Sequence, residues 1–421
     1  MLARFAGPTG GLLRQPDFLR LWTGQTISRF GSYITGAAVE LAALIVLGAT
    51  PAQMGLLAAA ISAPVLVFGL VAGVWVDRVR RRPLMIAADL VRTALLLTIP
   101  LAALTGQLRM AQLFIVAPLV GILSVFFDVA HQSYVPTLVG REQVVEANSR
   151  LGLSGSLAEV TGTGIAGVLV QFLGAPVAIL IDAASFIVSA GLLAGIRTPE
   201  PAPAPRQAGA NVSQELTEGI RYILARPILR ALAFRDVTSS FFGNFFAGLY
   251  ALYCLRDLGM SPALIGLSVA AGGVGNLLGA LVTQRVTRRF GIGPTILAVL
   301  AVSTAISLLI PLAGGPLIVA AGMVFAAQFI NDGFHAAYDI TNLSIRQAAT
   351  PDALLGRVNG AVYLLVAGIG PFGAAAGGLI AQSLGARSTL LIAVLLGSLG
   401  GLWIVFSPVV RMRALPELPS E

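Results

Sequence analysis

Residues 53–82 of the chain read QMGLLAAAISAPVLVFGLVAGVWVDRVRRR. The first 24 residues of this stretch carry no charge, and an apolar helix of about 20 residues is long enough to cross a hydrocarbon core of roughly 30 Å. The run ends in Asp77 and four arginines, which is typical of a membrane-spanning helix that meets the cytoplasm. The stretch therefore predicts a membrane-spanning helix followed by a short, strongly charged loop.

The rest of the chain repeats this pattern. Of its 421 residues 56% are hydrophobic and 11% are charged, whereas a soluble domain is about 25% charged. The mean hydropathy is +0.87, and so few charges cannot cover a water-soluble globule of this size. The apolar runs predict an all-α integral membrane protein with twelve membrane-spanning helices, at residues 21–47, 53–76, 83–105, 110–135, 150–172, 176–196, 228–254, 262–284, 292–312, 316–340, 356–382 and 387–407.

The positions of the 27 arginines predict the orientation of these spans, since the chain has no lysine. Twenty-one arginines lie in the two tails, or in and beside the loops that follow even-numbered spans. Only Arg109, Arg256 and Arg387 lie in the loops that follow odd-numbered spans. This asymmetry predicts that both termini are cytoplasmic. The scatter of the arginines also argues against nucleic-acid binding, in which basic residues gather in one patch.

An internal repeat organises the chain at a constant offset of 211 residues. The matched pairs include Pro16 and Pro227, Asp128 and Asp339, Gly162 and Gly373, Gly167 and Gly378, and Ala175 and Ala386. Because each copy holds an even number of spans, the repeat predicts two parallel six-helix bundles, residues 1–196 and 227–421. Residues 197–226 are predicted to form a cytoplasmic linker, proline-rich at first and then an amphipathic helix on the membrane surface.

The charged loop carries a specific spacing, Gly-x-x-x-Asp-Arg-x-x-Arg-Arg, formed by Gly73, Asp77, Arg78, Arg81 and Arg82. The glycine lets a neighbouring helix approach closely, and the acid and arginines can form a charge network at the cytoplasmic rim. The alternative is that the arginines only anchor the helix end. In this spacing the loop resembles the signature of the major facilitator superfamily of transporters.

The resemblance implies a gating relay at this rim. In the superfamily an acid near the cytoplasmic end of the fourth span joins the loop acid and an arginine, and together they latch the outward-facing state. The corresponding residues here are Asp77, Arg81 and Asp128. The repeat mate of Asp128 is Asp339, which could meet Arg288 or Arg289. The second copy of the loop has Gln284 in place of the acid, so the latch is expected mainly in the N-terminal half.

Small residues gather around a proline in the span 356–382 and predict a helix that packs closely and bends. They are Gly370, Pro371, Gly373, Gly377 and Gly378. The group resembles a Gly-Pro motif associated with antiporters, which normally lies on the fifth span. The fifth span here keeps the glycines, Gly162 and Gly167, but has Glu159 and Val160 where the second copy has Gly370 and Pro371.

Ionisable residues inside the spans are costly and therefore mark candidate functional sites. Glu159 lies near mid-membrane and is the first candidate for carrying a proton, unless it forms a structural ion pair with Arg29 or Arg235. Glu40 and Asp182 lie nearer the outer face and are candidates for ion coupling or substrate contact. Arg29 could bind an anionic substrate or, as we prefer, neutralise an acid.

The span 316–340 carries Asp332 and His335, which are three residues apart and share a helical face. The resemblance implies that this span lines the central cavity, so both are candidates for substrate contact. The only other histidine is His131, so no metal site is expected. Asp89 and Arg92 are also three apart and are expected to neutralise each other.

Catalytic chemistry and cofactors are not expected. The chain lacks a P-loop, which needs a lysine, and it lacks a His-Glu-x-x-His motif and a Ser/His/Asp order. Its single cysteine, Cys254, excludes an intramolecular disulfide. The remaining alternative of a membrane-embedded enzyme or sensor therefore has no support in the sequence.

Two stretches narrow the resemblance to the bacterial branch that exports drugs and siderophores, which includes macrolide and enterobactin exporters. They are DFLRLWTGQ at residues 17–25 and RVNG at residues 357–360. The resemblance implies a monomeric multidrug-resistance-type antiporter in the lipids of the bacterial inner (plasma) membrane, working by alternating access. We expect proton-driven export of a small amphipathic molecule, with Glu159 or Glu40 carrying the proton. The alternative is proton-coupled or facilitated uptake of a small metabolite.

Overall fold

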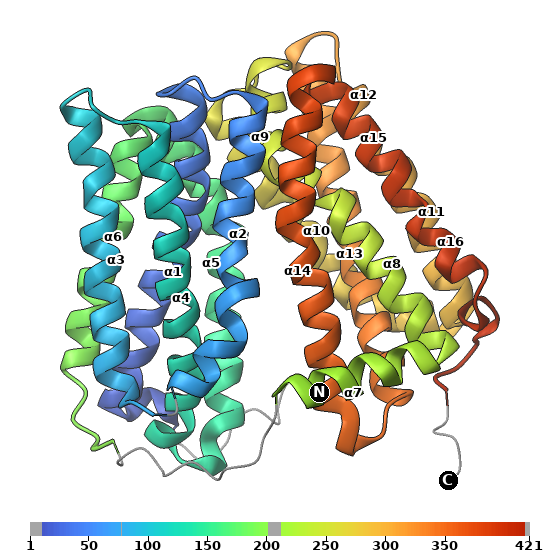
Figure 1. Ribbon diagram of the computed structural model, residues 1–421, viewed down its shortest axis with the longest axis horizontal. Coiled ribbons are helices and arrows are strands. Elements are labelled where there is room, and N and C mark those ends of the chain that lie inside the picture. The colour runs from blue at the N-terminus through green and yellow to red at the C-terminus, as the bar shows by residue number, and fades with distance from the viewer. Residues whose placement is uncertain (1–10, 77, 201–211, 417–421) are drawn as a thin grey trace. The chain divides into compact units, whose positions relative to one another are not determined.

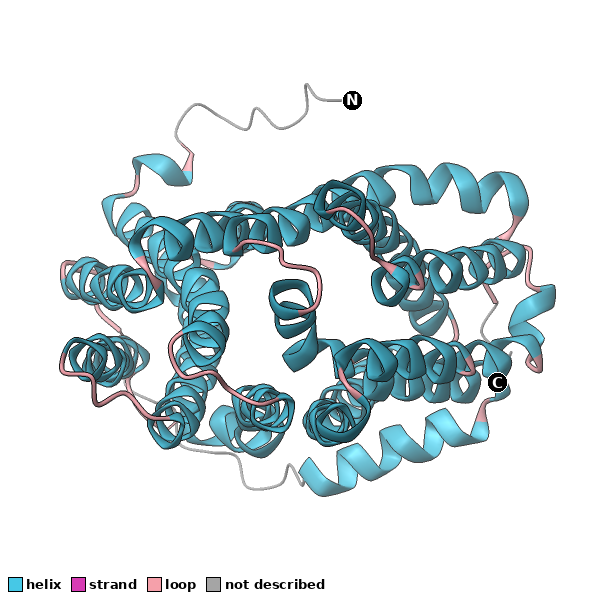
Figure 2. Ribbon diagram, turned by 90° about the horizontal axis from the view of Figure 1, so that it is seen from above, coloured by secondary structure: helices cyan, strands magenta, loops and turns pink. Residues whose placement is uncertain are grey.

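The computed structural model describes residues 11–76, 78–200 and 212–416, and its regular elements in these ranges are all helices (Figures 1 and 2). The long helices before the linker are α1 (Pro16–Ile45), α2 (Pro51–Val76), α3 (Arg81–Leu104), α4 (Met110–Val139), α5 (Val144–Leu173) and α6 (Ala175–Ala194). After it come α7 (Val212–Ala225), α8 (Pro227–Gly243), α9 (Phe245–Arg256), α10 (Pro262–Phe290), α11 (Ile292–Ser307), α12 (Leu309–Leu312), α13 (Leu317–Ala348), α14 (Asp352–Leu384), α15 (Ala386–Ser398) and α16 (Gly400–Val405). Short 3-10 turns precede α1 and α5 and follow α16, at Leu12–Arg14, Arg141–Gln143 and Pro408–Arg411.

The chain divides into two compact units. The first comprises Met1–Ala42 and Val67–Arg206, and the second comprises Ala43–Leu66 and Gln207–Glu421. The first half of α2 thus groups with the second unit, because glycines remove the side chains that would separate the helices. A Cβ added to Gly378 of α14 would lie 2.6 Å from the Cα of Gly55, and one added to Gly248 of α9 would lie 2.6 Å from the carbonyl oxygen of Met54.

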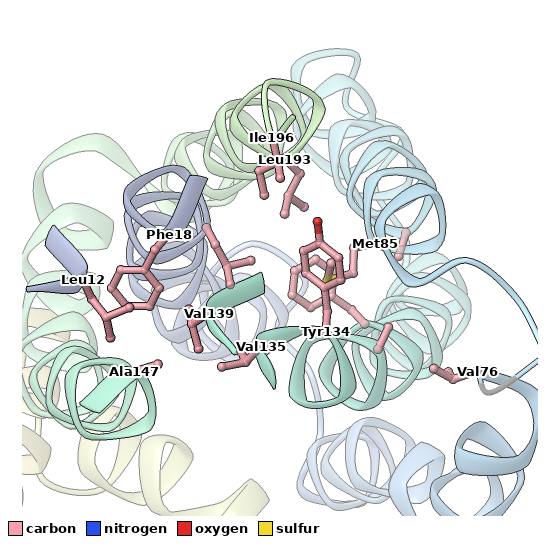
Figure 3. Packing of buried hydrophobic residues seen from close by; sticks show 14 residues of the cluster. Leu12, Phe18, Val76, Met85, Tyr134, Val135, Val139, Ala147, Leu193 and Ile196 are labelled. Carbon is pink, nitrogen blue, oxygen red and sulfur yellow. The ribbon is translucent and has the colours of Figure 1, made fainter. Parts of the chain in front are cut away.

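The core of the first unit forms where α1, α3, α4 and α6 meet (Figure 3). Phe18, Met85 and Tyr134 are fully buried there, and Leu193 from α6 closes the cluster. α3 packs against both α4 and α6. Large apolar side chains point inward from several helices, so close van der Waals packing fixes how these helices meet.

The second unit is held together by the close pair α10 and α13. A Cβ added to Gly275 or Gly279 of α10 would overlap the carbonyl oxygens of Phe329 or Gly333 on α13. Backbone contact of this kind is how helices associate where lipid removes the hydrophobic driving force. A second cluster, centred on Ile296 and Ile345, joins α11 to α13.

The amphipathic helix predicted in the linker is present as α7, but its apolar face is covered by protein. Ile223 is 2% exposed and packs with Val358 of α14. The Arg357 guanidinium of α14 lies 2.6 Å from the Glu218 carboxylate of α7. Figure 1 shows α7 running across the ends of α8 and α14. The prediction that this face rests on the membrane is therefore corrected: it rests on α14.

Ten helical segments of the described residues are long and apolar enough to cross a membrane. The other two of the twelve predicted spans have features that weaken their apolar character. The span 21–47 lies in α1, which carries Arg29 and Glu40. The span 228–254 is divided at Asn244 into helices of 17 and 12 residues. Twelve membrane-spanning helices therefore stay a prediction.

The 211-residue repeat is visible in the backbone. α1 begins at Pro16 and α8 at Pro227. α5 and α14 both end at a glycine of positive φ, Gly174 at +84° and Gly385 at +82°. This left-handed conformation is accessible to glycine without strain, and it turns the chain into the next helix at the same register in both copies.

Candidate functional site

Two hollows in the second unit share a wall. The larger, here called the broad cavity, has a volume of about 920 Å³ and lies between α2, α8, α13 and α14. The smaller, here called the side pocket, has a volume of about 300 Å³ and lies between α8, α9, α11, α13 and α15. Arg235, Ser239 and His335 line both. Both volumes are in the range of small-molecule sites in proteins.

A charged network on α8 and α13 forms the shared wall. The Arg235 guanidinium lies 3.2 Å from the Asp236 carboxylate and 3.6 Å from the centre of the Tyr338 ring. The Tyr338 hydroxyl donates to Asp236 Oδ1 at 2.8 Å, and the Asn342 amide donates to Oδ2 at 2.7 Å. Asp236 therefore has both oxygens occupied, and Arg235 is fixed between a carboxylate and a ring.

The three α13 candidates lie in different surroundings. His335 is exposed and lines both hollows, and Asp339 is exposed and lines the broad cavity. Asp332 is seated against α10 instead, where a Cβ added to Gly272 would overlap its carboxylate. The charged groups nearest Asp339 include Arg235 and Arg346.

The polar candidates of the first unit gather where α1 faces α4 and α5. Arg29 of α1 lies 3.8 Å from Asp128 of α4, and both side chains are about half exposed. Glu159 of α5 is exposed and lies beside the Tyr33 hydroxyl. The structure thus pairs Arg29 with an acid, as preferred from the sequence, and that acid is Asp128.

Asp182 and Glu40 lie outside the group where α1 faces α4 and α5. Asp182 of α6 is 1% exposed and accepts a hydrogen bond from Ser185 at 2.9 Å. Its carboxylate occupies the space that a side chain on Gly31 of α1 would fill. Glu40 is half-buried near the end of α1. Asp182 is therefore satisfied within the helix packing, which is how buried acids are tolerated.

The predicted neutralising pair on α3 is confirmed. Asp89 and Arg92 form a buried ion pair. The Arg92 guanidinium also lies over the rings of Phe127 and Phe186, at 4.5 and 4.1 Å from their centres, and donates to Ser124 at 3.2 Å. Its charge is therefore compensated by the carboxylate and the two rings, although its Nε has no hydrogen-bond partner among the described residues.

At the charged rim the arginines have structural partners. Arg82 donates to the carbonyl oxygens of Leu193 and Ala194 at the end of α6, a favourable position for a cation. Glu200 accepts the backbone N–H groups of Arg81 and Arg82 at the start of α3. Arg78 is exposed. Asp77 lies outside the described residues, so the relay of Asp77, Arg81 and Asp128 stays a prediction.

Asp17 ties the start of α1 to the end of α6. Its Oδ2 accepts the Thr198 hydroxyl at 2.7 Å and the backbone N–H groups of Arg197 and Thr198 at 3.1 and 2.8 Å, and Arg20 lies 2.6 Å from Oδ1. Burial alone would raise the pKa of this carboxyl. The hydrogen bonds from Thr198, Arg197 and Arg20 outweigh it and hold the pKa below its ordinary value.

The glycine face of α14 makes the predicted close contacts. Gly373 faces the carbonyl oxygen of Phe241, and a Cβ on Gly377 would lie 2.8 Å from the Cα of Phe245. Gly370 lies against Asn244, and Pro371 is buried within the helix.

The first unit repeats one of these contacts. Gly162 of α5 packs against Phe30 and Tyr33 of α1, so Gly162 and Phe30 meet as their repeat mates Gly373 and Phe241 do. Gly167 is buried in α5. Gly73 differs, since no described atom lies within 4 Å of its Cβ position. The close helix approach predicted at Gly73 therefore stays a prediction.

Asp236, the centre of the α8 network, is not among the site residues predicted from the sequence. The signal was available, because Asp236 follows Arg235 inside a predicted span, where every charge is costly. Tyr33 is not among them either, because a tyrosine in an apolar run carries no comparable signal. In the described part of the chain, no three His, Cys, Asp or Glu residues gather as metal ligands would.

Comparisons with known proteins agree with this architecture. The sequence profile of a family described as transmembrane secretion effector matches residues 9–421. The multidrug efflux pump Tap of Mycolicibacterium fortuitum is 28% identical over 369 residues, which cover 85% of this chain and 87% of Tap. The enterobactin exporter EntS of Escherichia coli is 26% identical over 351 residues, covering 83% of this chain and 81% of EntS.

The fold is also that of solved transporters. A bacterial homologue of the iron transporter ferroportin, in its inward-facing state, has a TM-score of 0.74 over 94% of this chain and 98% of its own, at 17% identity. A bacterial homologue of the lysosomal transporter Spinster has a TM-score of 0.73 over 97% of this chain and all of its own, at 15% identity. At such identities the likeness shows the shared fold alone.

Proposed function

Because the chain belongs to the transmembrane secretion effector family of the major facilitator superfamily, and is therefore a multi-pass membrane transporter and not an enzyme, we propose that it exports small amphipathic molecules from bacteria. The names of its relatives support this direction: one is a multidrug efflux pump and another exports enterobactin. The proposed cargo is drug-like or siderophore-like, and the proposed location is the inner membrane.

The observation that carries the proposal is the broad cavity. Its wall combines the charged groups Arg235, Asp236 and Asp339 with the apolar side chains of Val362 and Val366. A mixed lining of this kind suits a molecule with one polar and one apolar end, and a volume of about 920 Å³ is large enough for a drug-sized ligand.

Transport by alternating access is proposed from the repeat. Two parallel bundles, residues 1–196 and 227–421, would rock about the substrate, with twelve spans and both termini in the cytoplasm. The chain is proposed to act as a monomer surrounded by lipid. The glycine contacts of α14 would then serve as the hinge, and the charged rim of the first unit as the latch.

Proton antiport is proposed to run through the first unit. Glu159 is exposed beside Tyr33 on the face that also holds Arg29 and Asp128, so a proton gained or lost there changes the local charge balance. Glu40 is the second candidate. Protonation would thereby bias the equilibrium between the two access states.

The test is accumulation of a panel of dyes and antibiotics in cells that express the chain, with and without a protonophore. Export predicts lower accumulation on expression, and proton coupling predicts that the protonophore restores it. Accumulation that rises for a metabolite instead would favour uptake, the alternative direction. If Glu159→Gln and Glu40→Gln both leave pH-dependent transport intact, the assignment of the proton carrier is wrong.

A further inference from the structure

The side pocket has an unusual balance of charge. Its lining includes one arginine, Arg235, and no carboxylate. The acids of α8 and α13 are directed elsewhere: Asp236 is occupied by Tyr338 and Asn342, and Asp332 is seated against α10. A ligand in the pocket therefore meets a cation whose counter-ion lies outside the pocket.

Arg235 is a hydrogen-bond donor at the wall of the side pocket. The residue is 9% exposed, and its Nε has no partner among the described residues. The Nε is itself closed to solvent, so a ligand acceptor would approach the terminal nitrogens of the guanidinium, of which Nη1 is hydrogen-bonded to Asp236. Asp236 and the Tyr338 ring hold the guanidinium in place, which lowers the entropy that binding must overcome.

Other donors face the same space. Ser303 and Ser307 of α11 both donate to the Oδ1 of Asn331, so the NH₂ group of this amide is the one left to donate. All three residues line the pocket. Guanidinium and amide groups donate without accepting at these positions, and they therefore favour a ligand that accepts hydrogen bonds.

The rest of the lining combines polar side chains, among them Gln328 and Tyr250, with apolar ones. Phe242 and Phe246 line the pocket from α8 and α9, Leu300 from α11 and Val394 from α15. From Arg235 to Phe242 the helix α8 advances roughly 10 Å at helical rise, so the apolar ring lies beyond the cation along the same helix. The pocket thus offers apolar rings as well as the Arg235 cation to one ligand.

We propose that the second unit binds an amphipathic organic anion in the side pocket, with the acid group on Arg235 and the apolar body between Phe242 and Phe246. The proposal names a substrate class for the proposed exporter and so rests on that function. Because Arg235 and His335 line both hollows, a molecule held here adjoins the broad cavity and would enter it by crossing their wall.

The experiment measures equilibrium binding of radiolabelled decanoate to the purified full-length chain in lipid nanodiscs, with decanol and decylamine as competitors and empty nanodiscs as the blank. Decanoate is expected to compete at least tenfold better than either analogue. Arg235→Gln is expected to weaken decanoate binding by roughly 10- to 100-fold, the worth of a charge-assisted hydrogen bond. Equal competition by decanol would overturn the proposal.

A second pair of variants leaves the α8 network untouched. Thr304 lines the side pocket, and its hydroxyl donates only along its own helix, to the Leu300 carbonyl, so Thr304→Phe fills the pocket without breaking a bond between helices. Val302→Phe adds a ring on the same helix at an exposed position outside the pocket. Decanoate binding should fall tenfold or more in Thr304→Phe and stay within twofold in Val302→Phe. Binding that persists in Thr304→Phe would place the anion elsewhere and overturn the proposal.

These outcomes separate the binding site from the proposed function. Decanoate that fails to bind, in a chain that still lowers dye accumulation in cells, refutes the anion site and leaves export standing. Binding that obeys the variants, in a chain that exports no member of the panel, supports the site and counts against export.

Discussion

Asp236 of α8 is bound by two side chains of α13 and by the arginine beside it. Its two carboxylate oxygens accept hydrogen bonds from Tyr338 and Asn342, and its charge balances that of Arg235. The Asp236 side chain is 12% exposed and the Arg235 side chain 11%. Removing one partner of a pair this buried leaves the other charge without compensation. Asp236→Ala should therefore lower the free energy of unfolding by about 3–5 kcal/mol.

Thermal unfolding of the purified protein checks this prediction. Arg230→Ala removes a charge from an exposed position on the same helix and should change stability by less than about 0.5 kcal/mol. The double variant Arg235→Met with Asp236→Ala should recover part of the loss, because no charge is then left buried. Equal melting temperatures for Asp236→Ala and the wild type would contradict the network.

Asp17 makes a prediction about pH. Its pKa lies below the ordinary value in the folded protein, so its contribution to stability is fully present above the unfolded pKa of about 3.9 and is lost as the pH falls through the folded pKa. The wild type should lose stability on acidification below about pH 4. Asp17→Asn should show a flatter dependence in this window, measured as melting temperature against pH. Parallel curves for the two proteins would show that the Thr198 contact does not perturb this carboxyl.

At the scale of helices, the repeated contact between a glycine and a phenylalanine carbonyl gives a matched pair of sites. A Cβ at Gly373 would overlap the carbonyl oxygen of Phe241, whereas one at Gly162 would first meet the Cβ of Tyr33 at 3.0 Å. Gly373→Ala should therefore destabilise the protein by about 1–3 kcal/mol, and Gly162→Ala by less.

Gly356 supplies the control for this comparison, because it lies in α14 with open space at its Cβ position. Gly356→Ala should be neutral or stabilise by up to about 1 kcal/mol, the gain in helix propensity. The three melting temperatures should then rank Gly356→Ala first and Gly373→Ala last. Equal values for Gly162→Ala and Gly373→Ala would show that the second contact relaxes without cost.

The sequence predicts the helices better than it predicts which helices contact each other. Uncharged runs of about 20 residues predict helices whatever their neighbours, and the ten apolar segments follow from them. Pairs along one helix, such as Asp89 and Arg92, also follow from spacing. Contacts between helices do not follow from spacing, because the spacing of residues along one helix does not predict which faces of two helices pack together. The proximity of Asp128 to Arg29 and the break at Asn244 are therefore findings of the structure.

For the whole molecule, the repeat applies to the scaffold but only to some of the charges, such as Asp128 and Asp339. Pro16 and Gly174 recur as Pro227 and Gly385, but Arg235 has Gly24 as its mate. The hollows described above lie in the second unit, whereas the Arg29–Asp128 pair lies in the first. This division is consistent with proton coupling and substrate binding being carried by different copies of one unit, which the repeat alone would not predict.

The number of membrane crossings is the last prediction, and the lone cysteine makes it testable. Cys254 is fully buried, so the wild type should resist a membrane-impermeant maleimide. Single cysteines added to a Cys254→Ala background then report sidedness. With twelve spans, Gln107→Cys and Pro316→Cys should react in intact cells, and Glu142→Cys and Asp352→Cys only after permeabilisation.

The same four positions identify which segment fails to cross, if one does. Should α8 and α9 not span the membrane, the positions Gln107 and Glu142 would keep their sidedness while Pro316→Cys became protected and Asp352→Cys reactive. Should α1 alone not span, with the amino terminus still cytoplasmic, all four would reverse. Because every crossing inverts the sidedness of all later loops, the labelling pattern separates twelve spans from ten or eleven even though hydropathy alone detects ten.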